Sequence, residues 1–219
     1  MFVGHYAAAL ALKGKEPKTP LGPLFIAVQF VDILFFPLAL LGLESIEFVP
    51  GYTAVNDFKM EFPFTHGIVG TLFWCLVFAT VYYVLAGPKR TDRKRIAWVL
   101  AIAVASHWVA DLVVHTPDLP IVAGEPKLGF GLWQYKAATV WLEALLLIAG
   151  LGYYLKKTTS RSRTGKFASI ALVAFLIAVN YLNYYVLPAN NDLMGLTVSA
   201  LVTYFVLAGI AFWVDRQRA

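Results

Sequence analysis

The sequence predicts an all-α fold, a polytopic membrane bundle of six spanning helices preceded by a short N-terminal half-helix. Of the 219 residues, 59% are hydrophobic and only 14% are charged, whereas a soluble domain carries about 25% charged residues. Six apolar stretches approach the roughly 20 residues that a helix needs to cross a bilayer. The Lys and Arg residues gather in the connections on one side of these stretches, as is typical of membrane proteins.

The six expected spans are separated by prolines, Pro-Gly pairs and charged runs. Every backbone polar group in lipid must be satisfied within the chain, so each apolar stretch is expected to be helical. The sequence shows no internal repeat and no long linker, which predicts one domain over residues 1–219. The spans are expected at residues 21–43, 66–87, 96–115, 132–155, 167–187 and 195–214.

The first segment, residues 1–12, is apolar but too short to span a bilayer. It precedes a basic run that holds Lys13, Lys15 and Lys18. We therefore expect a re-entrant or half-length helix that reaches part-way into the membrane. The alternative is an amphipathic helix that lies on the membrane surface.

The basic residues predict the orientation of the bundle. Fifteen of the 18 Lys and Arg residues fall at residues 13–18, 88–95, 156–166 and 216–218, all on one side of the six-span arrangement. The positive-inside rule makes this side cytoplasmic, together with the C-terminus. The net charge of +5 is then explained by orientation and by contacts with anionic lipids. Membrane lipids are expected partners, and no nucleic-acid partner is expected.

Ionisable side chains occur where lipid disfavours them. A charge at bilayer depth costs at least about 2.5 kcal/mol and indicates a functional site. Asp32 lies twelve residues after Pro20 and His107 lies twelve residues after Arg95, or about 18 Å into the membrane. The full set of such residues is His5, Asp32, His66, His107, Asp111, His115 and Glu143.

The third span carries the clearest pattern. His107, Asp111 and His115 are spaced four residues apart and therefore share one helix face. Imidazole and carboxylate groups are ligands that suit zinc and other first-row divalent ions. We predict a site for one or two divalent ions, most simply zinc, in a cavity between the middle of the membrane and its outer face.

The order in which these ionisable residues follow one another along the chain resembles that of a known family. Gly4-His5 at the start, Asp32 in the next helix, Thr65-His66 at the start of another and the His107–Asp111 HxxxD pair resemble a family of inner-membrane metal-dependent hydrolases. The resemblance covers about residues 1–155, so residues 156–219 add two further spans. It implies a bacterial inner membrane and a metal-dependent hydrolytic activity.

The order is also similar to that of the zinc-dependent phospholipase C and single-strand nuclease superfamily, whose members bind three zinc ions on an all-helical fold. That resemblance implies a metal core of His5, Asp32, His66, His107 and Asp111, with His115 and Glu143 at the place of a third zinc. Three features depart from the superfamily, and the first is that His115 follows Asp111 more closely than is expected for its members. Thr139 stands where a histidine would precede Glu143 by four residues, and Met1 stands where the enzymes have a tryptophan.

We therefore expect a membrane-embedded, metal-dependent hydrolase for a phosphoester or other ester of a lipid or lipid-linked substrate. Asp111 would bridge to a second ion held by His5, and Glu143 or another free carboxylate would be the general base. The alternative is a metal-ion or proton transporter, because aligned His and acidic groups also build ion pathways. A third interpretation is a metal that only stabilises the bundle. Lys136, near the outer rim, either snorkels to the interface or presents a cation to an anionic substrate.

Overall fold

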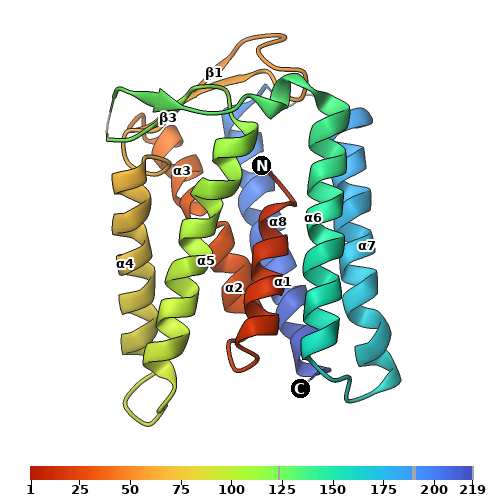
Figure 1. Cartoon of the computed structure of the whole chain (residues 1–219). Coiled ribbons are helices and arrows are strands. Elements are labelled where there is room, and N and C mark those ends of the chain that lie inside the picture. Colours follow the sequence, from red (N-terminus) through yellow and green to blue (C-terminus); the bar gives the residue numbers. More distant parts are fainter. Residues whose placement is uncertain (123, 189–190, 219) are drawn as a thin grey trace.

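The computed structural model describes residues 1–122, 124–188 and 191–218, which form one helical bundle with small antiparallel hairpins at one end (Figure 1). Five helices are long and apolar enough to cross a membrane. The all-α prediction is confirmed. The five helices are α4 (Ile68–Leu85), α5 (Arg93–Val114), α6 (Lys136–Lys157), α7 (Arg163–Tyr185) and α8 (Leu193–Arg216).

The first expected span is broken. Residues 21–43 form two helices, α2 (Leu21–Val28) and α3 (Phe30–Leu40), which meet at an angle of 47°. Counted as one span, this bent pair completes the six that were predicted. The break falls at Gln29, whose backbone leaves the helical region and whose buried side chain donates to the Phe2 carbonyl at 3.2 Å. A continuous helix over this stretch was therefore a wrong expectation.

The N-terminal half-helix is α1 (His5–Lys15), and it lies inside the bundle (Figure 1). It packs against α6, α2 and α5, and Tyr6, Ala9 and Leu10 are almost fully buried. A helix on the membrane surface would leave one face exposed, so the half-length helix is confirmed over the surface alternative. The Lys13 ammonium group at the end of α1 pairs with Asp215 of α8 at 2.8 Å.

The two ends of the bundle differ in charge. We call the end with residues 13–18, 88–95, 156–166 and the C-terminus the basic end, and the other the opposite end. At the opposite end β1 (Ser45–Phe48) pairs with β2 (Phe58–Glu61), and β3 (Leu119–Pro120) pairs with β4 (Lys127–Leu128), both antiparallel. A 3-10 turn, η1 (Leu132–Gln134), leads into α6. Figure 1 shows these elements across one end of the helices.

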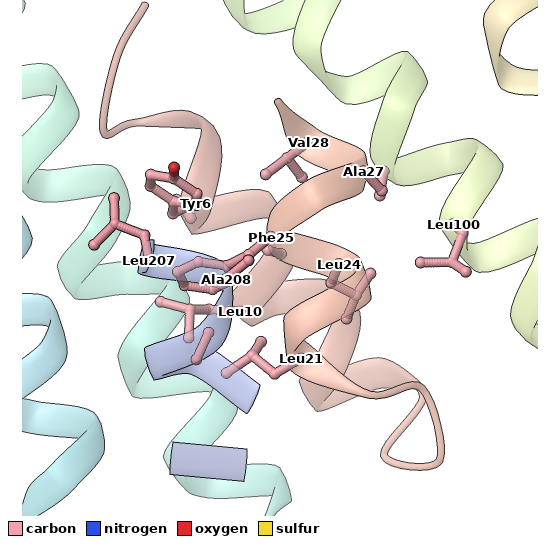
Figure 2. Packing of buried hydrophobic residues seen from close by; sticks show 14 of the residues in the cluster. Tyr6, Leu10, Leu21, Leu24, Phe25, Ala27, Val28, Leu100, Leu207 and Ala208 are labelled. Atoms are coloured by element: carbon pink, nitrogen blue, oxygen red, sulfur yellow. The ribbon is translucent and has the colours of Figure 1, made fainter. Parts of the chain in front are cut away.

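A large apolar core fills the half of the bundle nearer the basic end. Figure 2 shows it where α1, α2, α5 and α8 meet, with Leu10, Phe25 and Leu100 among its members. Along each helix the core residues lie on the basic-end side of the ionisable residues, as Leu10 does relative to His5 and Leu100 relative to His107. The outer surface is also apolar, with Leu85 80% exposed and Trp141 68% exposed. This surface is compatible with an integral membrane protein.

Candidate metal site

Six of the predicted site residues converge at one place in the bundle interior. They come from four elements that are distant in sequence, and five of them are nearly fully buried, while the Asp32 side chain remains 17% exposed. The bundle therefore assembles a cluster that no single helix could form. Its members are His5 of α1, Asp32 of α3, His66 just before α4, His107 and Asp111 of α5, and His115 at the end of α5.

The Asp111 carboxylate is central to this cluster. Its Oδ1 atom lies 3.2 Å from His5 Nε2. Its Oδ2 atom lies 2.9 Å from His107 Nε2 and 3.7 Å from His115 Nε2. The two oxygens thus face different histidines, which is the disposition of a carboxylate that can bridge two ions. The Met1 amine also lies 2.5 Å from Oδ1.

The second carboxylate, Asp32, faces the same space from α3. Its Oδ1 atom lies 3.1 Å from His66 Nε2 and 3.7 Å from His107 Nε2. Two groups of three residues have ligand atoms that all lie within 4.8 Å of one another. These groups are His5, His107 and Asp111, and Asp32, His66 and His107.

The broken first span positions His107. The Val28 carbonyl at the break accepts a hydrogen bond from His107 Nδ1 at 2.7 Å. A carbonyl can only accept, so Nδ1 carries the proton, and in the neutral ring Nε2 presents a lone pair. That lone pair faces the acceptor oxygen of Asp111 at 2.9 Å, so either a proton or a metal ion must lie between the two atoms. A divalent metal ion meets this need.

Two other histidines are held in the same way. Thr65 Oγ1 donates to the Glu44 carboxylate at 2.8 Å and lies 2.7 Å from His66 Nδ1, so it accepts the Nδ1 proton. His115 Nδ1 lies 2.9 Å from the Asp118 carboxylate. In both rings Nε2 is left facing the cluster. A metal-binding histidine commonly donates its other ring nitrogen to a carboxylate or carbonyl, which fixes its tautomer and orientation.

The ligand atoms also lack other partners. His5 Nε2, His107 Nε2 and Asp111 Oδ2 are buried, and none has a hydrogen bond within the part of the chain that the structure describes. Buried polar atoms without partners cost about 1–3 kcal/mol each, so several in one place require an explanation. A metal ion accounts for all three together. The donor set of imidazole nitrogens and carboxylate oxygens suits a divalent first-row ion.

Glu143 lies outside the two ligand groups. It is fully buried and accepts hydrogen bonds from the backbone amides of Phe2 at 3.2 Å and Gly4 at 2.8 Å. These amides precede α1, so the carboxylate also faces the positive end of that helix. The Tyr184 hydroxyl donates to Glu143 at 2.9 Å. Its role as a general base stays a prediction.

The last two helices contribute residues that the sequence did not indicate. Tyr184 of α7 reaches Glu143, and the Tyr204 hydroxyl of α8 donates to Asp32 Oδ2 at 3.1 Å. The sequence located the expected site within residues 1–155, and no tyrosine was among the expected site residues. Glu44 and Asp118 were also missed. Asp118 follows His115 by three residues, a spacing that could have indicated it.

The cluster lies in the wall of a cavity of about 690 Å³. Asp32, His66, Asp111 and His115 line it, and so do Tyr184 and Tyr204. Aromatic residues of the hairpins, among them Phe58 and Phe62, form its boundary at the opposite end. The cavity is large enough for a small polar group next to the cluster together with part of an apolar chain.

Comparisons of the chain with protein families, with curated proteins and with solved structures found no match. The fold and the site together define a class, that of helical bundles with membrane-spanning character and a buried His/Asp cluster that can hold a metal ion.

Proposed function

We propose that this protein is a membrane-embedded, metal-dependent hydrolase that acts on a phosphoester or other ester of a lipid or lipid-linked substrate. The observation that supports it most is the cluster itself. His66, His107 and His115 are each fixed through Nδ1, and their Nε2 atoms face the two carboxylates. The resemblance to inner-membrane metal-dependent hydrolases rests on five members of the cluster: His5, Asp32, His66, His107 and Asp111.

One or two zinc ions are the occupants that we propose for the cluster. A bound ion would supply a Lewis acid that polarises the ester oxygen and lowers the pKa of the attacking water. The residues of the chain provide the geometry: Asp111 presents one oxygen to His5 and the other to His107, and Asp32 completes the second group. Burial of the cluster excludes bulk water from the reacting ester.

The proton of the attacking water would move to Glu143 through Tyr184. The Tyr184 hydroxyl lines the cavity and donates to the Glu143 carboxylate. It can accept a proton from the cavity while it passes its own to Glu143. Through this path a proton from the cavity would reach Glu143, although the Glu143 carboxylate itself does not line the cavity.

The apolar core favours a hydrolase over a transporter. A transporter needs a polar path that continues from the cluster to the basic end. In the described part of the chain, the space on that side holds the core of Leu10, Phe25, Leu100 and their neighbours (Figure 2). The cavity opens instead toward the opposite end, where the hairpin residues line it. A hydrolase needs no polar path that continues to the basic end.

The experiment begins with metal analysis of detergent-purified protein prepared without chelators. We expect about one or two divalent ions per chain, mostly zinc. His107→Ala and Asp111→Ala should each deplete the metal, whereas Ser106→Ala on the same helix should retain it. Folded wild-type protein without any bound metal would refute the proposal.

Turnover is then measured on a panel of phospholipids, lipid phosphates and short soluble phosphoesters. Glu143→Gln and Tyr184→Phe should keep the metal and lower turnover by about 10²–10⁴-fold, the scale for loss of a general base. Tyr154→Phe, which alters a buried tyrosine nearer the basic end, is the control and should have little effect. Zinc or proton flux across sealed liposomes, with no hydrolysis by the wild type, would establish the transporter instead.

A further inference from the structure

The last two helices are linked at both ends, because the chain continues from α7 to α8 at the opposite end and hydrogen bonds link them near the basic end. Near the basic end, Arg218 donates to the Gly165 carbonyl at 3.0 Å, and the Arg161 amide donates to the Gln217 carbonyl at 3.0 Å. From there α7 and α8 diverge toward the opposite end (Figure 1). We call the space between the two helices the fork. It is narrow at the basic end and widens toward the opposite end.

The inner faces of this fork line the cavity that holds the metal cluster. From α7 and the segment just after it they present Val179, Asn183 and Leu187, and from α8 they present Leu196, Ser199, Ala200 and Thr203. Four of these seven residues are aliphatic. Asn183 and Ser199 are exposed although they line the cavity, so the space between the helices is open. Both helices have membrane-spanning length and composition, so the solvent at this opening is lipid.

Lys136 brings a positive charge to the same cavity. It is the one Lys or Arg among the described residues of the cavity lining. Its ammonium group lies 5.7 Å from the Tyr185 ring centre, and no carboxylate lies within ion-pair distance in the described ranges. It is the first residue of α6 and lies on the side of the cavity toward the opposite end. A free ammonium group at this position would attract an anionic headgroup.

We propose that a phosphate-bearing lipid enters this cavity sideways from the bilayer, between α7 and α8. Its phosphate lies between the His/Asp cluster and Lys136, and its acyl chain stays between the inner faces of the two helices. The proposal rests on the proposed function, because it names the lipid that the cluster would hydrolyse and the route by which it arrives. It also explains why two helices beyond residue 155 line the site.

The second cavity offers a competing place for a lipid chain. This groove of about 750 Å³ lies between α5 and α6 over α1 and is lined by small apolar residues such as Ala8, Ala105 and Ala149. It touches His5 but not Asp32 or His66. No Lys or Arg side chain lines it among the described residues. A phosphate there would meet neither Lys136 nor most of the cluster, so we favour the fork.

The direct test measures binding without hydrolysis. The purified protein is placed in phosphatidylcholine vesicles that contain phosphatidic acid with a photoactivatable diazirine in its acyl chain. After illumination, the labelled residues are located by mass spectrometry. We expect saturable labelling at Val179, Leu196 and Ala200 that excess unlabelled phosphatidic acid competes away. Labelling confined to the α5–α6 groove, or unsaturable labelling of outward residues such as Val202, would overturn the proposal.

Variants test the route and the charge. Ala200→Trp fills the fork, and the matched Val202→Trp adds the same bulk on the outer face of α8. Only Ala200→Trp should abolish saturable labelling. Lys136→Gln should weaken phosphatidic-acid binding about tenfold, since one charge-assisted contact is lost, and Lys136→Arg should restore it. Equal effects of both tryptophans, or no effect of Lys136→Gln, would contradict the proposal.

Turnover separates failure of this proposal from failure of the hydrolase. Ala200→Trp should block hydrolysis of a long-chain lipid phosphate and spare a short soluble phosphoester, which can enter from the opposite end. Saturable labelling in the fork without any hydrolysis would refute the enzyme and leave the lipid site. Hydrolysis of both substrates that Ala200→Trp leaves unchanged would refute the lateral route and leave the enzyme.

Discussion

Three histidines of the site, His66, His107 and His115, each use one ring nitrogen for a hydrogen bond within the fold and direct the other toward the cluster. His66 shows this most fully. The Thr65 hydroxyl donates its proton to Glu44, so its oxygen is left to accept the Nδ1 proton of the His66 ring. The Glu44 carboxylate is itself fixed, since it accepts from the amides of Phe64 and Thr65 at 3.0 and 2.9 Å. One buried acid, Glu44, therefore holds the loop before α4 in place. Through Thr65 it also fixes the His66 ring with Nε2 directed at the cluster.

This arrangement predicts the effect of a small change at Thr65. Thr65→Val keeps the shape of the side chain and removes the acceptor of the His66 Nδ1 proton. We expect metal affinity to fall by about 10–100-fold, the usual effect of losing such an outer partner. Competition with a chromophoric zinc chelator measures the affinity.

Thr71 provides the control for this prediction. Its buried hydroxyl donates to the Thr65 carbonyl at 3.3 Å and contacts no histidine. Thr71→Val should therefore leave metal affinity unchanged within about a factor of two, as expected for a site whose ligands keep their partners. Equal losses in both variants would show that packing of the loop, and not the histidine hydrogen bond, sets the affinity.

At the scale of elements, the position of His5 depends on how closely α1 approaches α6. A methyl group added at Gly150 of α6 would lie 2.7 Å from the Ala7 carbonyl oxygen, closer than such atoms approach without displacement. Glycine at this position lets α1 lie against α6. Glu143, which lies about two turns before Gly150 in α6, then reaches the amides of Phe2 and Gly4.

Gly150→Ala should therefore displace α1 and weaken both the fold and the metal site. Overpacking of this kind costs about 1–3 kcal/mol, so we expect a lower melting temperature and a reduced metal content. Gly152→Ala on the same helix is the matched control, because a methyl group there meets no atom within 4 Å. Thermal unfolding in detergent, followed by metal analysis, distinguishes the two. A Gly150→Ala protein as stable and as metal-rich as Gly152→Ala would contradict the close approach.

The elements also show what the sequence could and could not predict. The spans, the half-helix and the ligand candidates were predictable because hydropathy and buried charge are local signals, and six of the seven candidates do cluster. The break at Gln29 was not, because its stretch is continuously apolar apart from Gln29 and Asp32. Its cause is a set of contacts with α1 and α5, which are distant in sequence.

The tyrosines of the last two helices show the same limit. Tyr204 contacts Asp32 across 172 positions of the chain, and nothing around Tyr204 in the sequence distinguishes it from a packing residue. Only the folded bundle identifies its partner. For Glu143 the sequence predicted the burial of the side chain within a span. It did not predict the hydrogen bonds that Glu143 accepts from the amides of Phe2 and Gly4.

At the scale of the whole molecule, charge divides the bundle along its axis. The basic loops lie at one end and the hairpins at the other (Figure 1). Residues of the hairpins line the cavity, so its mouth lies at the opposite end. If the positive-inside rule holds, the basic end is cytoplasmic and the cavity opens toward the outer face. The substrate would then come from the outer leaflet, because the fork between α7 and α8 is narrow at the basic end.

Cysteine labelling of intact cells tests this orientation. In a Cys75→Ala background, single cysteines replace Lys89 or Arg161 at the basic end and Lys59 or Glu125 at the opposite end, and all four positions are exposed. A membrane-impermeant thiol reagent should label the last two and spare the first two until the cells are permeabilised. The physical reason is that fifteen of the 18 basic residues would otherwise have to be carried across the membrane against its potential, which costs about 2.3 kcal/mol per charge for each 100 mV. The reverse pattern would place the cavity on the cytoplasmic side, and a lipid of the inner leaflet would then be the one that reaches the fork.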